Sequence, residues 1–150
     1  MPNYKVFTIP RNTINQNLPR PKKWEKFDHE CKRANIKLDD NTLDKILSYS
    51  GKNFFRNGEN YNIHRIKYNL KEGEYTIDEH QDSCKFTIII YLNKSQEVKD
   101  DFWVGNSNVK ENVWSKQDNE YKCLIFWGNT PHKGKISGKG NREILCFFCD

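Results

Sequence analysis

The chain has 150 residues, of which 35% are hydrophobic and 13% aromatic, and 25 basic against 20 acidic residues give a formal net charge of +5. This length suits one domain and is short for two, and the mild, dispersed positive charge argues against a dedicated nucleic-acid binder. An odd count of five cysteines, a polar start and no long apolar run point to a soluble, cytoplasmic protein without membrane contact.

The N-terminal region is expected to be an arm followed by a helix. Prolines and the apolar stretch at residues 5–9 predict an arm over residues 1–20 with a short strand in it. The remaining residues, 21–150, are expected to form a single domain. A first helix is expected from Pro21, because proline fits the first turn of a helix. Its apolar residues recur at helical spacing, at Trp24, Phe27, Cys31 and Ala34.

A second helix is expected between a cap at residue 40 or 41 and Gly51. Asp40 or Asn41 can cap it, and Gly51 can end it. Its apolar stripe consists of Leu43, Ile46 and Leu47. An early group of basic residues is expected to be a solvated helix face. This group consists of Arg20, Lys22, Lys23, Lys26, Lys32 and Arg33.

The second half of the chain has the pattern of short strands separated by turn residues. The expected strands are residues 63–68, 74–78, 85–92, 100–104, 112–114, 121–127 and 142–148. Helices first and many strands afterwards indicate an α+β chain. We expect a double-stranded β-helix, a jelly-roll or cupin-like barrel, with the two N-terminal helices packed on one sheet.

The strand at residues 85–92 is expected to separate two environments, because side chains alternate between the faces of a strand. One face is wholly apolar, with Phe86, Ile88, Ile90 and Leu92. The other carries Thr87, Ile89 and Tyr91 and can line a cavity, where Tyr91 either offers its hydroxyl to a ligand or simply packs. The same alternation sends Cys146 and Cys149 to opposite faces, which favours buried thiols over a zinc site.

Two sequence patterns can supply a metal site. Among the four histidines only His80 has an acid two residues later, Asp82, and in an extended segment these side chains point the same way toward one cation. His132 follows the turn at 128–131, where it is either a ligand or a surface residue. Arg142 lies ten positions later (142 minus 132) on an apolar strand face, so its burial would require an anion.

These motifs resemble those of the iron(II)- and 2-oxoglutarate-dependent dioxygenases, in particular the prolyl 4-hydroxylase branch. The resemblance covers residues 68–150 and consists, in order, of YNLKEGEY, HQDS, IIIYLN and PHKGKISGKGNR. The family usually has a Gly-Gly-[Glu/Asp] stretch after the Y-L-N strand. DDFWVGNSN, residues 100–108, stands in its place, so this chain departs from the family at the substrate-facing wall.

The resemblance implies a role for each matched residue. His80, Asp82 and His132 correspond to the iron ligands, and Arg142 to the residue that pairs with the distal carboxylate of 2-oxoglutarate. Tyr91 matches a hydroxyl that supports the same end, and Tyr68 roughly matches a pocket tyrosine. The implied cofactors are Fe(II) and the co-substrate 2-oxoglutarate, with ascorbate as a further candidate.

The implied reaction uses O2 and 2-oxoglutarate to hydroxylate a substrate C–H and releases succinate and CO2. A peptidyl prolyl residue, or another protein side chain, is the leading substrate, and loops at residues 52–64 and 94–120 are expected to select it. Two alternatives stay open. The positive charge favours a nucleic-acid oxidative demethylase, although no second arginine follows Arg142. The chain could also be a non-catalytic barrel that serves as a binding module.

Overall fold

The computed structural model describes residues 4–16, 18–26, 30–51, 61–109, 113–114 and 119–150. Its elements in chain order are β1 (Tyr4–Pro10), α1 (Asn12–Asn15), β2 (Glu25–Lys26), β3 (Cys31–Ile36), α2 (Asp40–Ser50), β4 (Tyr61–His80), β5 (Phe86–Lys94), β6 (Lys99–Val104), β7 (Ser107–Asn108), β8 (Glu120–Trp127) and β9 (His132–Cys149). Within these residues no helix is long and apolar enough to cross a membrane.

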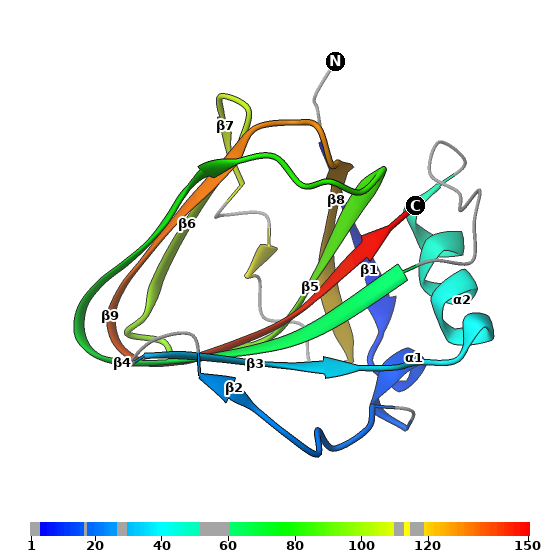
Figure 1. Cartoon of the computed structure of the whole chain (residues 1–150), viewed down its shortest axis with the longest axis horizontal. Coiled ribbons are helices and arrows are strands. Elements are labelled where there is room, and N and C mark those ends of the chain that lie inside the picture. The colour runs from blue at the N-terminus through cyan, green and yellow to red at the C-terminus, as the bar shows by residue number, and fades with distance from the viewer. Residues whose placement is uncertain (1–3, 17, 27–29, 52–60, 110–112, 115–118) are drawn as a thin grey trace.

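The strands β4 and β9 form the frame of the fold. They pair antiparallel along almost their whole length, ending with His80 opposite His132, and both curve strongly (Figure 1). The register shifts between Lys71 and Glu74, where Gly73 has φ +132°, and such a bulge bends a strand without ending it. One bent strand, β4, therefore replaces the two separate strands that were expected there.

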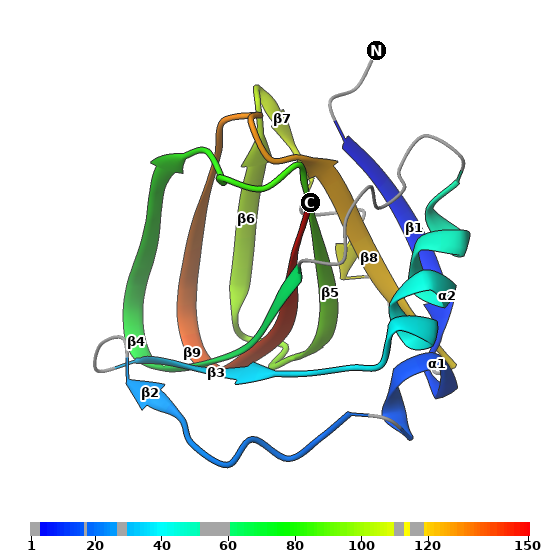
Figure 2. The same cartoon turned by 45° about the vertical axis from the view of Figure 1, so that its right-hand side comes forward.

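The sheet follows the order β1-β8-β5-β9-β4-β3-β2. β6 pairs with the first part of β9, residues 132–137. Because β4 and β9 curve, β6 faces β5 and β8 across an interior, as Figure 2 shows. The result is a cupin-like β-sandwich, in agreement with the predicted barrel class. The arm contributes to it, because β1 pairs with β8 along its full length.

Of the two expected N-terminal helices, the first is wrong. Residues 25–26 and 31–36 of that segment are β2 and β3, and residues 27–29, with Phe27, lie outside the described part. β3 pairs with β4 from Cys31 to Ile36, so sheet pairing overrides a local spacing that suited a helix. The expected strand at 112–114 is also not found in the described residues, since Val113 is helical.

The second expected helix is present as α2. Asp39 caps it, one residue earlier than expected, by accepting a hydrogen bond of 2.7 Å from the backbone N–H of Thr42. Gly51 follows it with φ +103°, a conformation that favours glycine. α2 packs against β1, the edge strand of the sheet (Figure 1).

Two groups of buried side chains fill the molecule. The outer cluster lies beneath the helices and β1 and consists of Phe7, Ile9, Ile14, Ile36, Leu38, Leu43, Ile46, Leu47, Ile63, Phe86, Ile88, Ile90, Leu92, Tyr121, Cys123, Ile125, Leu145, Phe147 and Cys149. The inner cluster lies inside the curved sheet and consists of Cys31, Tyr68, Leu70, Ile89, Tyr91, Val98, Phe102, Val104, Val109, Val113, Leu124, Phe126, Ile136, Ile144 and Cys146. The two expected faces of β5 fall into different clusters, as do Cys146 and Cys149, so these predictions are confirmed.

Candidate metal centre and adjoining pockets

The sheet brings together the three residues expected to bind a metal. His80 ends β4 and His132 begins β9, and the two are direct partners with ring centroids 4.2 Å apart. Asp82 follows β4 by two residues. One ligand atom from each residue lies within 4.8 Å of the others, a spacing that one cation can bridge. His132 thus begins a strand and is not a surface loop residue.

Hydrogen bonds orient both imidazole rings. His80 Nδ1 lies 2.7 Å from the carbonyl oxygen of Asp78, and His132 Nδ1 lies 2.8 Å from that of Thr130. Since a carbonyl only accepts, each Nδ1 carries the proton and donates it. Each Nε2 lone pair is then directed at Asp82, whose oxygens lie 3.4 and 3.3 Å away. This arrangement is typical of ligands prepared for a metal.

The carboxylate of Asp82 is held from two sides. Thr87 donates a hydrogen bond of 2.7 Å to Asp82 Oδ2. The backbone N–H of Asp82 donates to the carbonyl oxygen of Gly128 at 2.8 Å. A Cβ on Gly128 would overlap the carbonyl oxygen of Cys84, so this close approach requires glycine. Burial would raise the pKa of Asp82, but the adjoining imidazole of His132 and the hydrogen bond from Thr87 outweigh it and lower the pKa. Asp82 is therefore an anion at neutral pH and could serve as a metal ligand.

Two neutral imidazoles and one carboxylate form the ligand set of non-heme iron(II) oxygenases, which leaves positions open for small molecules. His80 has 45% of its side chain exposed, whereas His132 has 4%. A metal held by this trio would therefore lie where the interior meets solvent, open on the His80 side.

A pocket of about 270 Å³ connects this trio with Arg142. Its walls come from β3, β4, β5, β6, β8 and β9. The lining residues are Cys31, Arg33, His64, Ile66, Tyr68, Tyr75, Ile77, His80, Asp82, Thr87, Ile89, Phe102, Phe126, His132, Arg142, Ile144, Cys146 and Phe148. Most of this wall is apolar, so its few charged groups, Arg33, Asp82 and Arg142, are the ones that can orient a ligand.

Arg142 lies within β9, not at its start, and only 1% of it is exposed. Its Nε donates a hydrogen bond of 2.7 Å to Asp100 Oδ2, and Trp114 Nε1 donates to the same oxygen at 2.7 Å. Three buried side-chain polar atoms have no hydrogen-bond partner within the described residues: Thr13 Oγ1, which lies on α1 away from this pocket, Nη1 of Arg142 and the hydroxyl of Tyr91. Such atoms are costly to bury alone, so the neighbouring Arg142 Nη1 and Tyr91 hydroxyl are suited to a ligand oxygen.

The two expected tyrosines flank the guanidinium of Arg142. Its central carbon lies 4.9 Å from the ring centroid of Tyr68, its strand partner, and 6.0 Å from that of Tyr91. Burial raises the pKa of both tyrosines, which therefore remain protonated hydroxyls. The structure thus brings Tyr68, Tyr91 and Arg142 together as expected.

Sequence reasoning missed Asp100 and Trp114. The only signal was the departure at residues 100–108, where two aspartates stand in place of a glycine pair. No spacing rule could predict which of them turns inward. The structure shows that Asp100 is buried and that its neighbour Asp101 is half-buried and interacts with Asn108.

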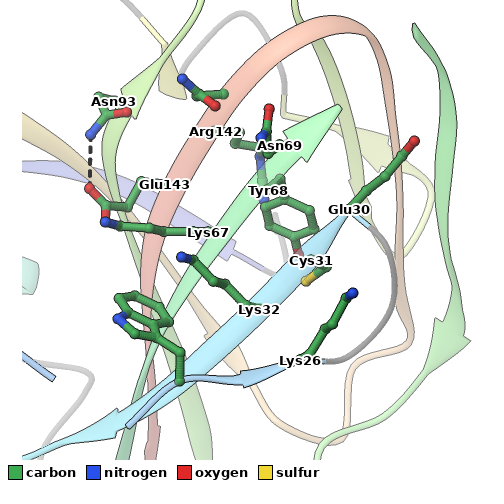
Figure 3. A pocket seen from close by; sticks show the side chains of 12 residues that line it. Lys26, Glu30, Cys31, Lys32, Lys67, Tyr68, Asn69, Asn93, Arg142 and Glu143 are labelled. Atoms are coloured by element: carbon green, nitrogen blue, oxygen red, sulfur yellow. Dashed lines mark hydrogen bonds and ion pairs between the residues drawn. The ribbon is translucent and has the colours of Figure 1, made fainter. Parts of the chain in front are cut away.

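A second pocket, of about 550 Å³, shares Cys31, Tyr68 and Arg142 with the first (Figure 3). Part of the early basic group lines it, on β2 and β3 and not on a helix face as expected. The ammonium groups of Lys32 and Lys67 each lie 5.0 Å from the ring centroid of Trp24. The other lining residues are Lys26, Glu30, Asn69, Asn93, Asn141 and Glu143.

No known family pattern matches the sequence, and no curated protein does. Solved structures resemble its fold. KdgF from Halomonas sp. has a TM-score of 0.50 at 10% identity, over 85% of this chain and 84% of that one. An oxidoreductase of the 2OG-Fe(II) oxygenase family from Burkholderia pseudomallei has a TM-score of 0.49 at 15% identity, over 84% and 70%. The similarity to KdgF shows a shared fold, and the chemistry must be argued from the site itself.

Proposed function

We propose that this chain is an iron(II)- and 2-oxoglutarate-dependent dioxygenase that hydroxylates a substrate C–H and releases succinate and CO2. One observation carries the proposal. One pocket is lined both by the possible metal ligands His80, Asp82 and His132 and by a buried arginine, Arg142, whose Nη1 has no hydrogen-bond partner in the part of the chain that the structure describes. A ligand that is a chelator at one end and a carboxylate at the other fits both.

The residues fit the implied iron. His80, Asp82 and His132 would hold it, since their ligand atoms converge and hydrogen bonds fix their orientation. When bound, Fe(II) supplies the activation of O2 that protein side chains cannot provide. The chain's own part is to bind and orient the reactants, to keep Asp82 anionic and to keep the apolar wall of the pocket dry.

The residues also fit the distal carboxylate of 2-oxoglutarate. Arg142 Nη1 and the Tyr91 hydroxyl are both buried donors without a partner in the described chain, and a carboxylate can accept from both. The pocket volume, about 270 Å³, lies near the lower end for small-molecule sites, about 300 Å³. A small co-substrate therefore suits it better than a large one.

The proposed substrate is a peptidyl residue, with proline first, because the motifs resemble the prolyl 4-hydroxylase branch. The exposed side of His80 is where it would approach. Of the loops expected to select it, residues 52–60, 110–112 and 115–118 lie outside the described part. Ascorbate stays a prediction from the resemblance.

A spectroscopic experiment tests the assignment. Protein loaded with iron(II) and 2-oxoglutarate without oxygen should show a visible metal-to-ligand charge-transfer band. His80→Ala should lose the band. His64→Ala is the matched control, since His64 lines the same pocket outside the ligand set, and it should keep the band. Absence of the band in the wild type, or its persistence in His80→Ala, would reject the proposal.

Turnover then identifies the substrate class. Conversion of 2-oxoglutarate to succinate is followed while proline-containing peptides, lysine-containing peptides and methylated oligonucleotides are offered in parallel. Proline-containing peptides should stimulate turnover and gain one oxygen atom by mass spectrometry. Stimulation by another class alone would replace the proposed substrate but keep the reaction.

One observation favours a nucleic-acid demethylase as the second candidate: Lys26, Lys32 and Lys67 line the 550 Å³ pocket beside Trp24. Contacts to phosphates would make oligonucleotide binding weaken steeply with salt. Salt-independent or absent binding would remove this candidate. A folded protein that binds neither iron(II) nor 2-oxoglutarate would instead favour the non-catalytic module.

A further inference from the structure

The arginine of the pocket is already paired within the protein. The side chains of Asp100 and Arg142 are 2% and 1% exposed, and their Oδ2 and Nε lie 2.7 Å apart. Trp114 donates to the same oxygen and holds the carboxylate in place. Asp100 comes from β6 and Arg142 from β9, so the tertiary fold makes this pair.

Stability alone does not explain the pair. A buried ion pair is seldom more stabilising than apolar side chains of similar size. Beside this pair, Arg142 Nη1 and the Tyr91 hydroxyl have no hydrogen-bond partner within the described residues, which costs free energy in the ligand-free protein. Asp100 thus occupies one edge of the guanidinium and leaves the other edge for a ligand.

We propose that Asp100 is a built-in counter-ion that weakens the binding of any carboxylate at Arg142, so that the pocket retains only ligands that also chelate the metal. The identity of that ligand as 2-oxoglutarate rests on the proposed function. A carboxylate that reaches Nη1 is attracted by Arg142 and repelled by Asp100, and both effects are strong where water is excluded. Simple dicarboxylates, including the product succinate, therefore bind weakly and leave.

Lys94 is a further charge to be considered, since it interacts electrostatically with both Asp100 and Arg142. Its ammonium lies 5.8 Å from the ring centroid of Trp114 and donates to the carbonyl oxygens of Ser95 and Val98 at 3.2 and 2.6 Å. Burial outweighs the effect of Asp100 and lowers the pKa of Lys94. With Lys94 charged, Arg142, Lys94 and Asp100 sum to +1, which admits one carboxylate. Loss of the Asp100 charge would raise the sum to +2.

The test uses glutarate, which has two carboxylates and no 2-keto group, on metal-free protein. Binding is followed by amide and indole chemical shifts in an NMR titration at constant ionic strength. Asp100→Asn keeps the size of the side chain and an oxygen that can accept from Arg142 Nε. It should bind glutarate at least about tenfold more tightly than the wild type, or about 1.4 kcal/mol.

Asp101→Asn is the matched control. It makes the same charge change one residue away, at a side chain that contacts Asn108. It should bind glutarate as the wild type does. In the Asp100→Asn background, Arg142→Gln should abolish the gain, which would locate the ligand at the arginine.

A second variant should change the glutarate affinity in the opposite direction. Trp114→Phe removes the hydrogen bond that disperses the charge of Asp100, so glutarate should bind about threefold more weakly. A folded Asp100→Asn protein with unchanged or weaker glutarate binding overturns the proposal. If Asp100→Asn does not fold, wild-type affinity in Trp114→Phe overturns it. Neither titration contains iron, so failure here is distinct from loss of the charge-transfer band.

Discussion

Neighbouring residues of β9 enter two different environments. Leu145 and Phe147 point into the outer cluster, which is built almost entirely from apolar side chains. Ile144 and Cys146 point into the inner cluster, and Arg142 continues the same face. Strand alternation alone separates the two sets.

The two clusters differ in how completely they are filled. The inner one borders a pocket of about 270 Å³ and adjoins the buried charged pair Asp100 and Arg142. Filled apolar packing stabilises a fold, whereas buried charges and empty volume cost free energy. We infer that the outer cluster holds the sheet together and that the inner one uses this stability to maintain a site.

The largest expected effect is on stability. Leu145→Ala should lower the free energy of unfolding by about 4 kcal/mol, because it opens a cavity in filled packing. Ile144→Ala removes as many atoms on the pocket side and should cost about 2 kcal/mol, since that wall already borders empty volume. Urea unfolding measures both. Equal or reversed costs would contradict the division between the clusters.

The next effect concerns metal binding without a matching loss of stability. His132→Ala should weaken the binding of Mn(II), an air-stable substitute for Fe(II), by more than about 100-fold, since even outer partners of a metal ligand contribute 10–100-fold. Calorimetric titration measures it, with His64→Ala as the control. Undiminished binding in His132→Ala would remove this histidine from the site.

A smaller effect is expected from Thr87, the polar residue on the inner face of β5. Thr87→Val removes its hydrogen bond to Asp82 but keeps the shape, and should weaken Mn(II) binding about tenfold. Thr87→Ser keeps the hydroxyl and should bind close to the wild type. If both variants bind alike, the hydroxyl does not orient the carboxylate.

The smallest effect lies beyond both clusters, at the cap of α2. Two hydrogen bonds with Thr42 lower the pKa of Asp39, and the one with its side chain has a larger effect than the one with its backbone. The contribution of the Asp39 charge to the free energy of unfolding should therefore be fully present above the pKa of the unfolded chain, about 3.9. It should be lost as the pH falls through the pKa of Asp39 in the folded protein. Asp39→Asn keeps a cap without this charge, so its melting temperature should depend less on pH between about 5 and 2. Mn(II) binding at neutral pH should not change.

Particular residues show how far the sequence could be followed. His80 and Asp82 were found from a two-residue spacing, and the faces of β5 from simple alternation, because both depend only on local backbone geometry. The helix expected from Pro21 failed, because pairing of β3 with β4 overrode the local pattern. The two strands expected between residues 63 and 78 became one, since a bulge can continue a strand through turn-like residues.

The sequence by itself determined the residue types, the strand alternation and the order of motifs, and from these the barrel class, the ligand candidates and Arg142 could be predicted. Only the tertiary structure decided that His132 lies opposite His80 and that Asp100, not Asp101, meets Arg142. Register between distant strands depends on where bulges bend them, and a shift of one residue reverses every side chain. Contacts across the interior are therefore fixed by the whole sheet and not by any local segment.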